Sequence, residues 1–240
     1  MTDIDDKREP TDRERRRQET AERILDAAME LINEGGYESF TIARLAGELD
    51  CAVGALYRYF TGKDAILRGL QLRCIERIAD DLRDVRDAAV RASSDLSERE
   101  GALLRVLSAV VAYESLIDRR PTDYRLLALS LGDPRHLLTT DLVRQVFDAL
   151  RGVLAVLSQA LEEAAACGAL DAGSSDDRAF VLWGATQGLL QLRKLERVEP
   201  KVAQRHLFDE MLRAQLVGWG ADGGQLRALQ ARARSLLTAL

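Results

Sequence analysis

Apolar residues recur along this chain at intervals of three and four, the spacing that places them on one face of an α-helix. The clearest stripe is Ile66, Leu70, Cys74, Ile78 and Leu82. Ala, Leu, Arg and Glu dominate the composition, which favours helix over a large sheet. The pattern predicts an all-α fold, with helices over about residues 12–34, 42–49, 53–59, 63–83, 97–111, 121–132, 140–167, 174–197, 201–219 and 225–240.

Capping residues and glycines mark the predicted helix ends. Gly35 and Gly36 end the first helix, because glycine adopts the left-handed backbone that a helix C-terminus favours. Thr41 is the expected N-cap of the second helix. Four further pairs have the three-residue spacing of a capping box, namely Thr11–Glu14, Thr61–Asp64, Ser97–Glu100 and Ser174–Asp177.

Two short predicted helices, 42–49 and 53–59, are joined by a tight turn at Asp50 and Cys51. This arrangement is typical of a helix-turn-helix, whose second helix enters the major groove of DNA. A small core between these helices and the first one is expected from Leu45, Ala46, Leu49, Leu56 and Phe60.

The amino-acid sequence of the same region is more specific than its helix pattern. Residues 40–46 (FTIARLA) and 53–66 (VGALYRYFTGKDAI) resemble the DNA-binding signature of the TetR family of transcriptional regulators. The resemblance implies a flexible arm at 1–12 and a three-helix DNA-binding domain at 13–62. It also implies a larger helical domain at 63–240 for dimerisation and ligand sensing.

The resemblance implies phosphate contacts from Thr41, Tyr57, Tyr59 and Lys63. Lys63 suits this role by itself, since a cation at a helix N-terminus can hold a phosphate together with free N–H groups. An alternative is that both tyrosines only close the small core. The predicted DNA-binding residues are Thr41, Arg44, Val53, Gly54, Tyr57, Arg58, Tyr59 and Lys63.

The signature has departures that weaken polar contacts to DNA. Asp50 replaces the usual turn glycine, and Ala52 replaces the usual serine cap of the second helix. Ala43, Val53 and Ala55 stand where polar or basic residues are common. These changes leave open a second function, that of a helical interaction protein that no longer binds DNA.

Charge does not by itself favour DNA binding. The net charge is −5, and residues 1–70 hold eleven basic and fifteen acidic residues. Residues 13–17 nevertheless contain four arginines and a single acid, Glu14. This run is interpreted either as a basic arm that follows DNA or as a solvated charged face.

The larger domain is expected to dimerise and to hold an effector. Gly184 and Gly188 lie four residues apart, a spacing that allows close helix approach. The resemblance implies a dimer interface there, and the alternative is core packing within one chain. The family also has a ligand cavity in this domain, which an apolar small molecule would fill. The candidate lining residues, which could instead be ordinary core, are Tyr113, Tyr124, Phe147, Trp183 and Gln187.

The remaining chemistry argues against catalysis. Cys51, Cys74 and Cys167 lie far apart without metal spacing, and they are expected to be ordinary buried thiols in a reducing cytoplasm. No catalytic, cofactor or phosphate-loop motif is found, and neither a signal peptide nor a membrane span is predicted. The predicted function is a ligand-responsive repressor that binds a near-palindromic operator as a homodimer. A dimer of the same fold controlled by a protein partner remains an alternative.

Overall fold

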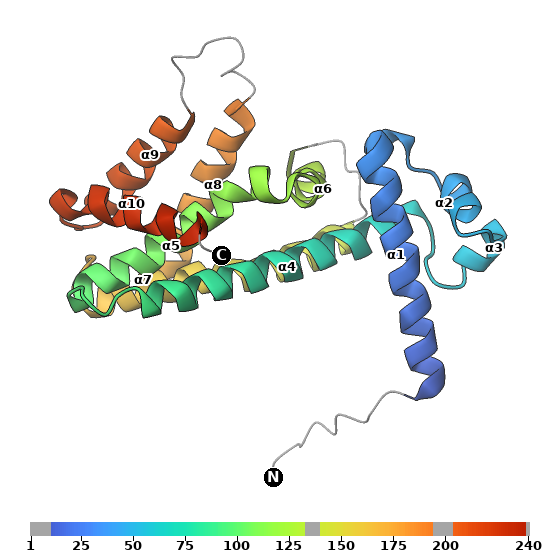
Figure 1. Ribbon diagram of the computed structural model, residues 1–240, viewed down its shortest axis with the longest axis horizontal. Helices are drawn as coiled ribbons and strands as arrows, with labels where there is room; N and C mark the ends of the chain where they lie inside the picture. Colours follow the sequence, from blue (N-terminus) through green and yellow to red (C-terminus); the bar gives the residue numbers. More distant parts are fainter. Residues whose placement is uncertain (1–10, 133–139, 194–203, 239–240) are drawn as a thin grey trace.

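The computed structural model describes residues 11–132, 140–193 and 204–238, and these residues form helices and no strand (Figure 1). The all-α prediction is therefore confirmed. The helices are α1 (Asp12–Ser39), α2 (Ile42–Glu48), α3 (Val53–Leu56), α4 (Lys63–Arg91), α5 (Glu98–Arg119), α6 (Pro121–Gly132), α7 (Thr140–Ala166), α8 (Ser175–Leu192), α9 (Gln204–Gly218) and α10 (Gly223–Thr238).

The N-terminal unit, α1 to α3, lies at one end of the molecule (Figure 1). Thr11 and Glu14 close the predicted capping box at the start of α1. Gly36 has a positive φ of 73° and kinks the helix where the glycine pair was predicted to end it, and the helix then continues to Ser39. Most of the predicted arm, residues 1–10, lies outside the described residues.

Two local predictions in this unit are wrong. Helix α3 spans only Val53–Leu56, because the chain leaves the α-helix at Tyr57 and the next N–H groups, of Arg58 and Tyr59, bond three residues back instead of four. Thr61 and Asp64 form no capping box, because α4 begins at Lys63 with Gly62 as its N-cap. Glycine has no side chain to accept the free N–H groups there.

Helix α4 joins the N-terminal unit to the body, which comprises α4 to α10 (Figure 1). The predicted stripe from Ile66 to Leu82 is buried, and the helix continues to Arg91, beyond the predicted end near residue 83. One hydrophobic cluster extends from Ile24 in α1 along α4 to Leu126 in α6 and Val153 in α7. The N-terminal unit and the body therefore share a continuous core.

The distal part of the body is a second cluster, formed by α5, α7, α8, α9 and α10. The predicted capping box of Ser97 with Glu100 starts α5. Helix α10 packs on α5, and two of its arginines pair with acids of the body. Arg232 pairs with Asp95, and Arg234 pairs with both Glu114 and Asp209. Within the described part of the chain, no helix is both long and apolar enough to cross a membrane.

Candidate functional site

The turn between α2 and α3 is held by backbone and capping bonds. The hydroxyl of Thr41 accepts the Arg44 N–H at 3.2 Å, and the N–H of Cys51 bonds to the Ala46 carbonyl at 3.0 Å. Asp50 has a φ of 47° and is the one non-glycine residue with a positive φ in the described ranges. The aspartate therefore replaces glycine at a small conformational cost.

The surface of α3 is open to solvent. Val53 and Gly54 are exposed, and a Cβ built on Gly54 would meet no atom within 4 Å. The fold itself therefore does not require glycine at this position. An exposed helix turn with bare backbone lets another molecule approach the main chain closely.

The residues after α3 differ in exposure. Tyr57 is 54% exposed and Arg58 is exposed, so neither contributes to the small core. Tyr59 is half-buried and packs against the core. The interpretation of the tyrosines as core residues therefore fits Tyr59 but not Tyr57. Leu45, Ala46 and Leu56 are buried as predicted.

Lys63 points back onto the end of α1. Its Nζ lies 4.2 Å from the centre of the Tyr37 ring and 5.6 Å from that of Phe40. The same Nζ donates to the Tyr37 carbonyl at 3.5 Å. Burial, followed by the charges of Asp64 and Glu38, raises the pKa of Tyr37. Lys63 therefore stabilises the junction of α1 with α4, whether or not it also binds a phosphate.

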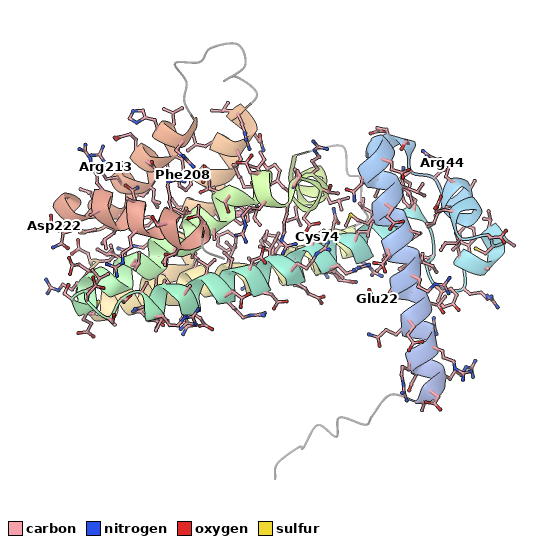
Figure 2. All side chains as sticks on the ribbon, in the orientation of Figure 1. Glu22, Arg44, Cys74, Phe208, Arg213 and Asp222 are labelled. Atoms are coloured by element: carbon pink, nitrogen blue, oxygen red, sulfur yellow. The ribbon has the colours of Figure 1, made fainter. Side chains whose placement is uncertain are left out.

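Arg44 is likewise directed toward α1. Its guanidinium donates to the Ser39 carbonyl at 3.1 Å, and Figure 2 places the residue on α2 near the end of α1. Arg44 is exposed and can leave this contact at the cost of one surface hydrogen bond.

Two of the five predicted pocket residues line an apolar cavity in the body. Trp183 in α8 donates from Nε1 to the phenolic oxygen of Tyr113 in α5 at 3.0 Å. Both border a cavity of about 20 Å3, together with apolar side chains of α4, α5 and α7. Burial raises the pKa of Tyr113, although the Trp183 hydrogen bond lowers it in part. A cavity of this size has room for about one water molecule.

The other three predicted pocket residues lie elsewhere. Phe147 is 42% exposed and stacks on Phe180, because the adjacent Val146 occupies the inward face of α7. Tyr124 is half-buried beside α4. Gln187 is buried, but it does not border the cavity.

Gly184 and Gly188 are exposed on α8, and a Cβ added at either would meet no atom within 4 Å. Val181 and Leu192 continue this exposed stripe at helical spacing. The neighbouring α9 exposes Leu207 and Val217. Helices α8 and α9 therefore present small and apolar side chains to solvent; these six residues are called the α8–α9 face below.

Polar contacts between α4 and α6 were not foreseen. Gln71 donates from Nε2 to the Leu126 carbonyl at 2.9 Å, and Arg77 pairs with the buried Asp123 at 2.9 Å. Cys74 donates from its thiol to the same carboxylate at 3.4 Å. Sequence alone shows polar residues interrupting an apolar helix face, but it does not reveal a partner about fifty positions away.

Burial, followed by the charge of Asp123, raises the pKa of Cys74 to about 12. The three cysteines are free; Cys74 is buried as predicted, whereas Cys51 and Cys167 are only partly buried, because each lies near a helix end. No group of three metal-binding side chains occurs among residues 11–132, 140–193 and 204–238.

Residues 24–70 match the model of the bacterial regulatory proteins of the tetR family, which covers α2, α3 and the adjoining parts of α1 and α4. This region of the chain is a DNA-binding region of the TetR family. The family consists of regulatory proteins, in agreement with the prediction that the chain is not an enzyme. The match confirms the resemblance carried by residues 40–46 and 53–66.

One curated protein similar to this chain is the HTH-type transcriptional repressor KstR of Rhodococcus jostii. It is 45% identical over 60 residues, which cover 25% of this chain and 28% of the relative. Alignments to the curated relatives span about a third of their length or less.

Solved structures are similar over most of the chain. The transcriptional regulator FadR of Bacillus subtilis, in complex with stearoyl-CoA, has a TM-score of 0.57 and 21% identity, and the match covers 82% of this chain and 98% of that one. SmeT in complex with triclosan has a TM-score of 0.60 and 21% identity, with 86% and 94% covered. At this level of identity, the likeness shows a common fold.

Proposed function

We propose that this protein is a ligand-responsive transcriptional repressor. It binds a near-palindromic operator as a homodimer through α2 and α3, and it releases DNA when an apolar small molecule enters the body. The observation that carries the proposal is the exposed surface of α3 on a TetR-family helix-turn-helix. The family name and the repressor KstR support the repressor function.

The DNA contacts in this proposal divide between bases and backbone. Val53 and Gly54 face outward and can approach base edges, where small apolar groups meet thymine methyl groups. Tyr57 and Arg58 are free to reach phosphates. Thr41 and Lys63 lie at the starts of α2 and α4, which are positive ends of helix dipoles.

The homodimer is proposed through the α8–α9 face. Monomers seldom leave a contiguous apolar stripe exposed, and small residues at four-residue spacing let two helices pack closely. Gly184 and Gly188 have no neighbour within 4 Å of an added Cβ, so the single chain supplies no reason for glycine there. Two-fold pairing would also match the symmetry of a palindromic operator.

The effector is proposed to be largely apolar. Stearoyl-CoA and triclosan in complexes of similar fold are consistent with this chemistry. The cavity beside Tyr113 and Trp183 is lined by apolar side chains, yet at about 20 Å3 it is too small for such a molecule. Binding must therefore displace surrounding side chains, which would couple ligand entry to movement of the helices that carry them.

A second candidate is the interaction protein without DNA binding. It is favoured by the missing cap at Ala52 and by the alanines at 43 and 55, which remove polar groups from the DNA-facing side. One experiment separates the two functions. Full-length protein is used to select duplexes from a random pool, with and without long-chain acyl-CoA or triclosan. Recovery of a palindromic sequence supports the repressor function. Absence of salt-dependent binding to any duplex would contradict it.

A further inference from the structure

An open cleft of about 670 Å3 lies between the first turns of α1 and the end of the helix-turn-helix. We propose that this arginine cleft holds the sugar–phosphate backbone of DNA beside the bases that α3 reads. The proposal rests on the proposed DNA-binding function and adds a contact that the family match, which starts at residue 24, does not contain. The residues lining the cleft are Asp12, Arg13, Arg16, Arg17, Thr20, Arg58 and Tyr59.

Charge is segregated around the first half of α1. Arg13, Arg16 and Arg17 share one helix face by their three- and four-residue spacing, and all three line the cleft. The acids Glu22 and Asp26 lie on the face toward α4, where both contact Arg73, at 3.5 and 2.6 Å (Figure 2 labels Glu22). Among the lining residues, four arginines, three on α1 and Arg58, stand against the single acid Asp12, so the cleft carries a net positive charge.

The cleft arginines have no ion-pair partner among the residues that the structure describes. The one lining acid, Asp12, pairs with Arg15 at 2.7 Å instead. Arg13 and Arg17 are four residues apart, a spacing at which like charges cost about 0.2–0.5 kcal/mol. Arginines near a helix N-terminus also oppose the helix dipole. Stability of the fold thus gives no reason for this cluster, whereas a bound polyanion would relieve both costs.

The position of the cleft fits DNA in particular. Helix α1 projects beyond α2 and α3 as one rod, and the capping box of Thr11 with Glu14 fixes its first turn (Figure 1). On the opposite wall, Arg58 directly follows the exposed Tyr57, so the cleft continues the surface of α3. Arginine binds phosphate oxygens through two parallel N–H groups. The expected contacts are therefore to phosphates and independent of base sequence.

The test compares the full-length protein with R13A/R16A/R17A on the duplex recovered by selection, or on a 40-bp duplex of arbitrary sequence. Affinity is measured from 50 to 200 mM salt. Each lost phosphate contact lowers the salt slope by about 0.9. Raising the salt from 50 to 200 mM should therefore weaken DNA binding by the triple variant about 40-fold less than it weakens DNA binding by the wild type. Base preference, read from a repeated selection, is expected to remain unchanged.

Two control variants make the result specific. R13K/R16K/R17K keeps the charges and should retain the wild-type salt slope. R83A/R91A/R227A removes three exposed arginines from the distal half of α4 and from α10, and it should leave the slope unchanged. If wild-type protein binds DNA and R13A/R16A/R17A keeps the full slope, the cleft proposal is overturned and the proposed function stands. If wild-type protein binds no duplex, both fall.

Discussion

The indole nitrogen of Trp183 donates to the phenolic oxygen of Tyr113 at 3.0 Å, and this hydrogen bond joins α8 to α5 beside the apolar cavity. Tyr113 is buried, and Trp183 is half-buried. The pair therefore connects the proposed effector cavity with the helix that carries the proposed dimer face. An effector that enlarges the cavity would have to move one of these two side chains.

Removing one partner of this pair should destabilise the protein. Tyr113→Phe leaves the Trp183 N–H without its acceptor, at an expected cost of about 1 kcal/mol in the free energy of unfolding. Denaturant unfolding of Tyr113→Phe, Trp183→Phe and the double variant measures the cost. The double variant should cost less than the sum of the single ones, and strict additivity would show that the hydrogen bond contributes nothing.

Dimerisation through the α8–α9 face can be tested at Gly188. Gly188 is exposed and a Cβ added there meets no atom within 4 Å in the single chain, so the fold is expected to tolerate a leucine. Between two closely packed helices it should cost about 1–3 kcal/mol per site. Sedimentation is expected to show monomer for Gly188→Leu. Gly152→Leu on α7, equally free of neighbours, is the matched control and should leave the dimer intact.

Phosphate binding by Lys63 predicts a loss of roughly one unit of salt slope in Lys63→Ala, with base preference unchanged. The structure adds a control, because Lys63 also contacts the Tyr37 ring at 4.2 Å. Tyr37→Leu removes the ring but keeps the cation, so it should lower stability and retain the slope. A Lys63→Ala variant with altered base preference and a full slope would show that Lys63 does not bind phosphate.

Cys74 should resist alkylation in the folded protein. The thiolate is the reactive form, and burial raises the pKa of Cys74 to about 12, so little thiolate exists at pH 8. Cys51 and Cys167 are partly exposed and should react first. Mass spectrometry after iodoacetamide treatment should find two labels in the native protein and three in denaturant. Three labels in the native protein would contradict the burial.

The Cys74 thiol also affects the stability of the protein at high pH. The unfolded chain releases the thiol proton near the ordinary value of 9.0, and the folded chain releases it only near 12. The unfolded state therefore binds fewer protons above pH 9, and the free energy of unfolding should fall as the pH rises through this range. Cys74→Ala should weaken this pH dependence.

Local signals in the sequence predicted most helix positions. The stripe from Ile66 to Leu82 is buried, and the hydroxyl of Ser174 accepts the Asp177 N–H as its spacing predicted. Capping and periodicity depend on neighbours within four residues, which a sequence displays directly. The capping box predicted for Thr61 and Asp64 is wrong because Thr61 lies one residue before the true N-cap, Gly62, and a sequence with three-residue spacing does not distinguish the two positions.

Tertiary contacts were much less predictable. Phe147 was assigned to a pocket by its size, yet its helical phase turns it outward. Helix α10 carries three arginines and no acid, and the sequence does not show that Arg232 and Arg234 pair with acids more than twenty positions away. The partner of a charged side chain depends on how the helices pack, and periodicity carries no information about that.

Control of DNA binding by the body should depend on the contacts between α4 and α6. Helix α4 starts at Lys63 beside the helix-turn-helix and holds α6 through Gln71 and Arg77. Recognition helices of a dimer must lie about 34–36 Å apart, or a multiple of that, so a small shift of α4 costs contacts at both half-sites. Asp123→Asn removes the Arg77 ion pair and should reduce the effect of an effector on DNA affinity. Asp95→Asn, which removes the Arg232 pair at the distal end, is the control.

The size of this effect is fixed by linkage. Whatever ligand weakens DNA binding must bind more weakly to the DNA complex by the same factor, typically about 5–150-fold. Calorimetric titration of one confirmed effector into the free dimer and into the DNA-bound dimer measures that factor directly. Wild type and Asp95→Asn should give the same factor, and Asp123→Asn a smaller one. Equal affinities in the two wild-type titrations would show that this ligand does not act on DNA binding, because a ligand with equal affinity for both states shifts no equilibrium.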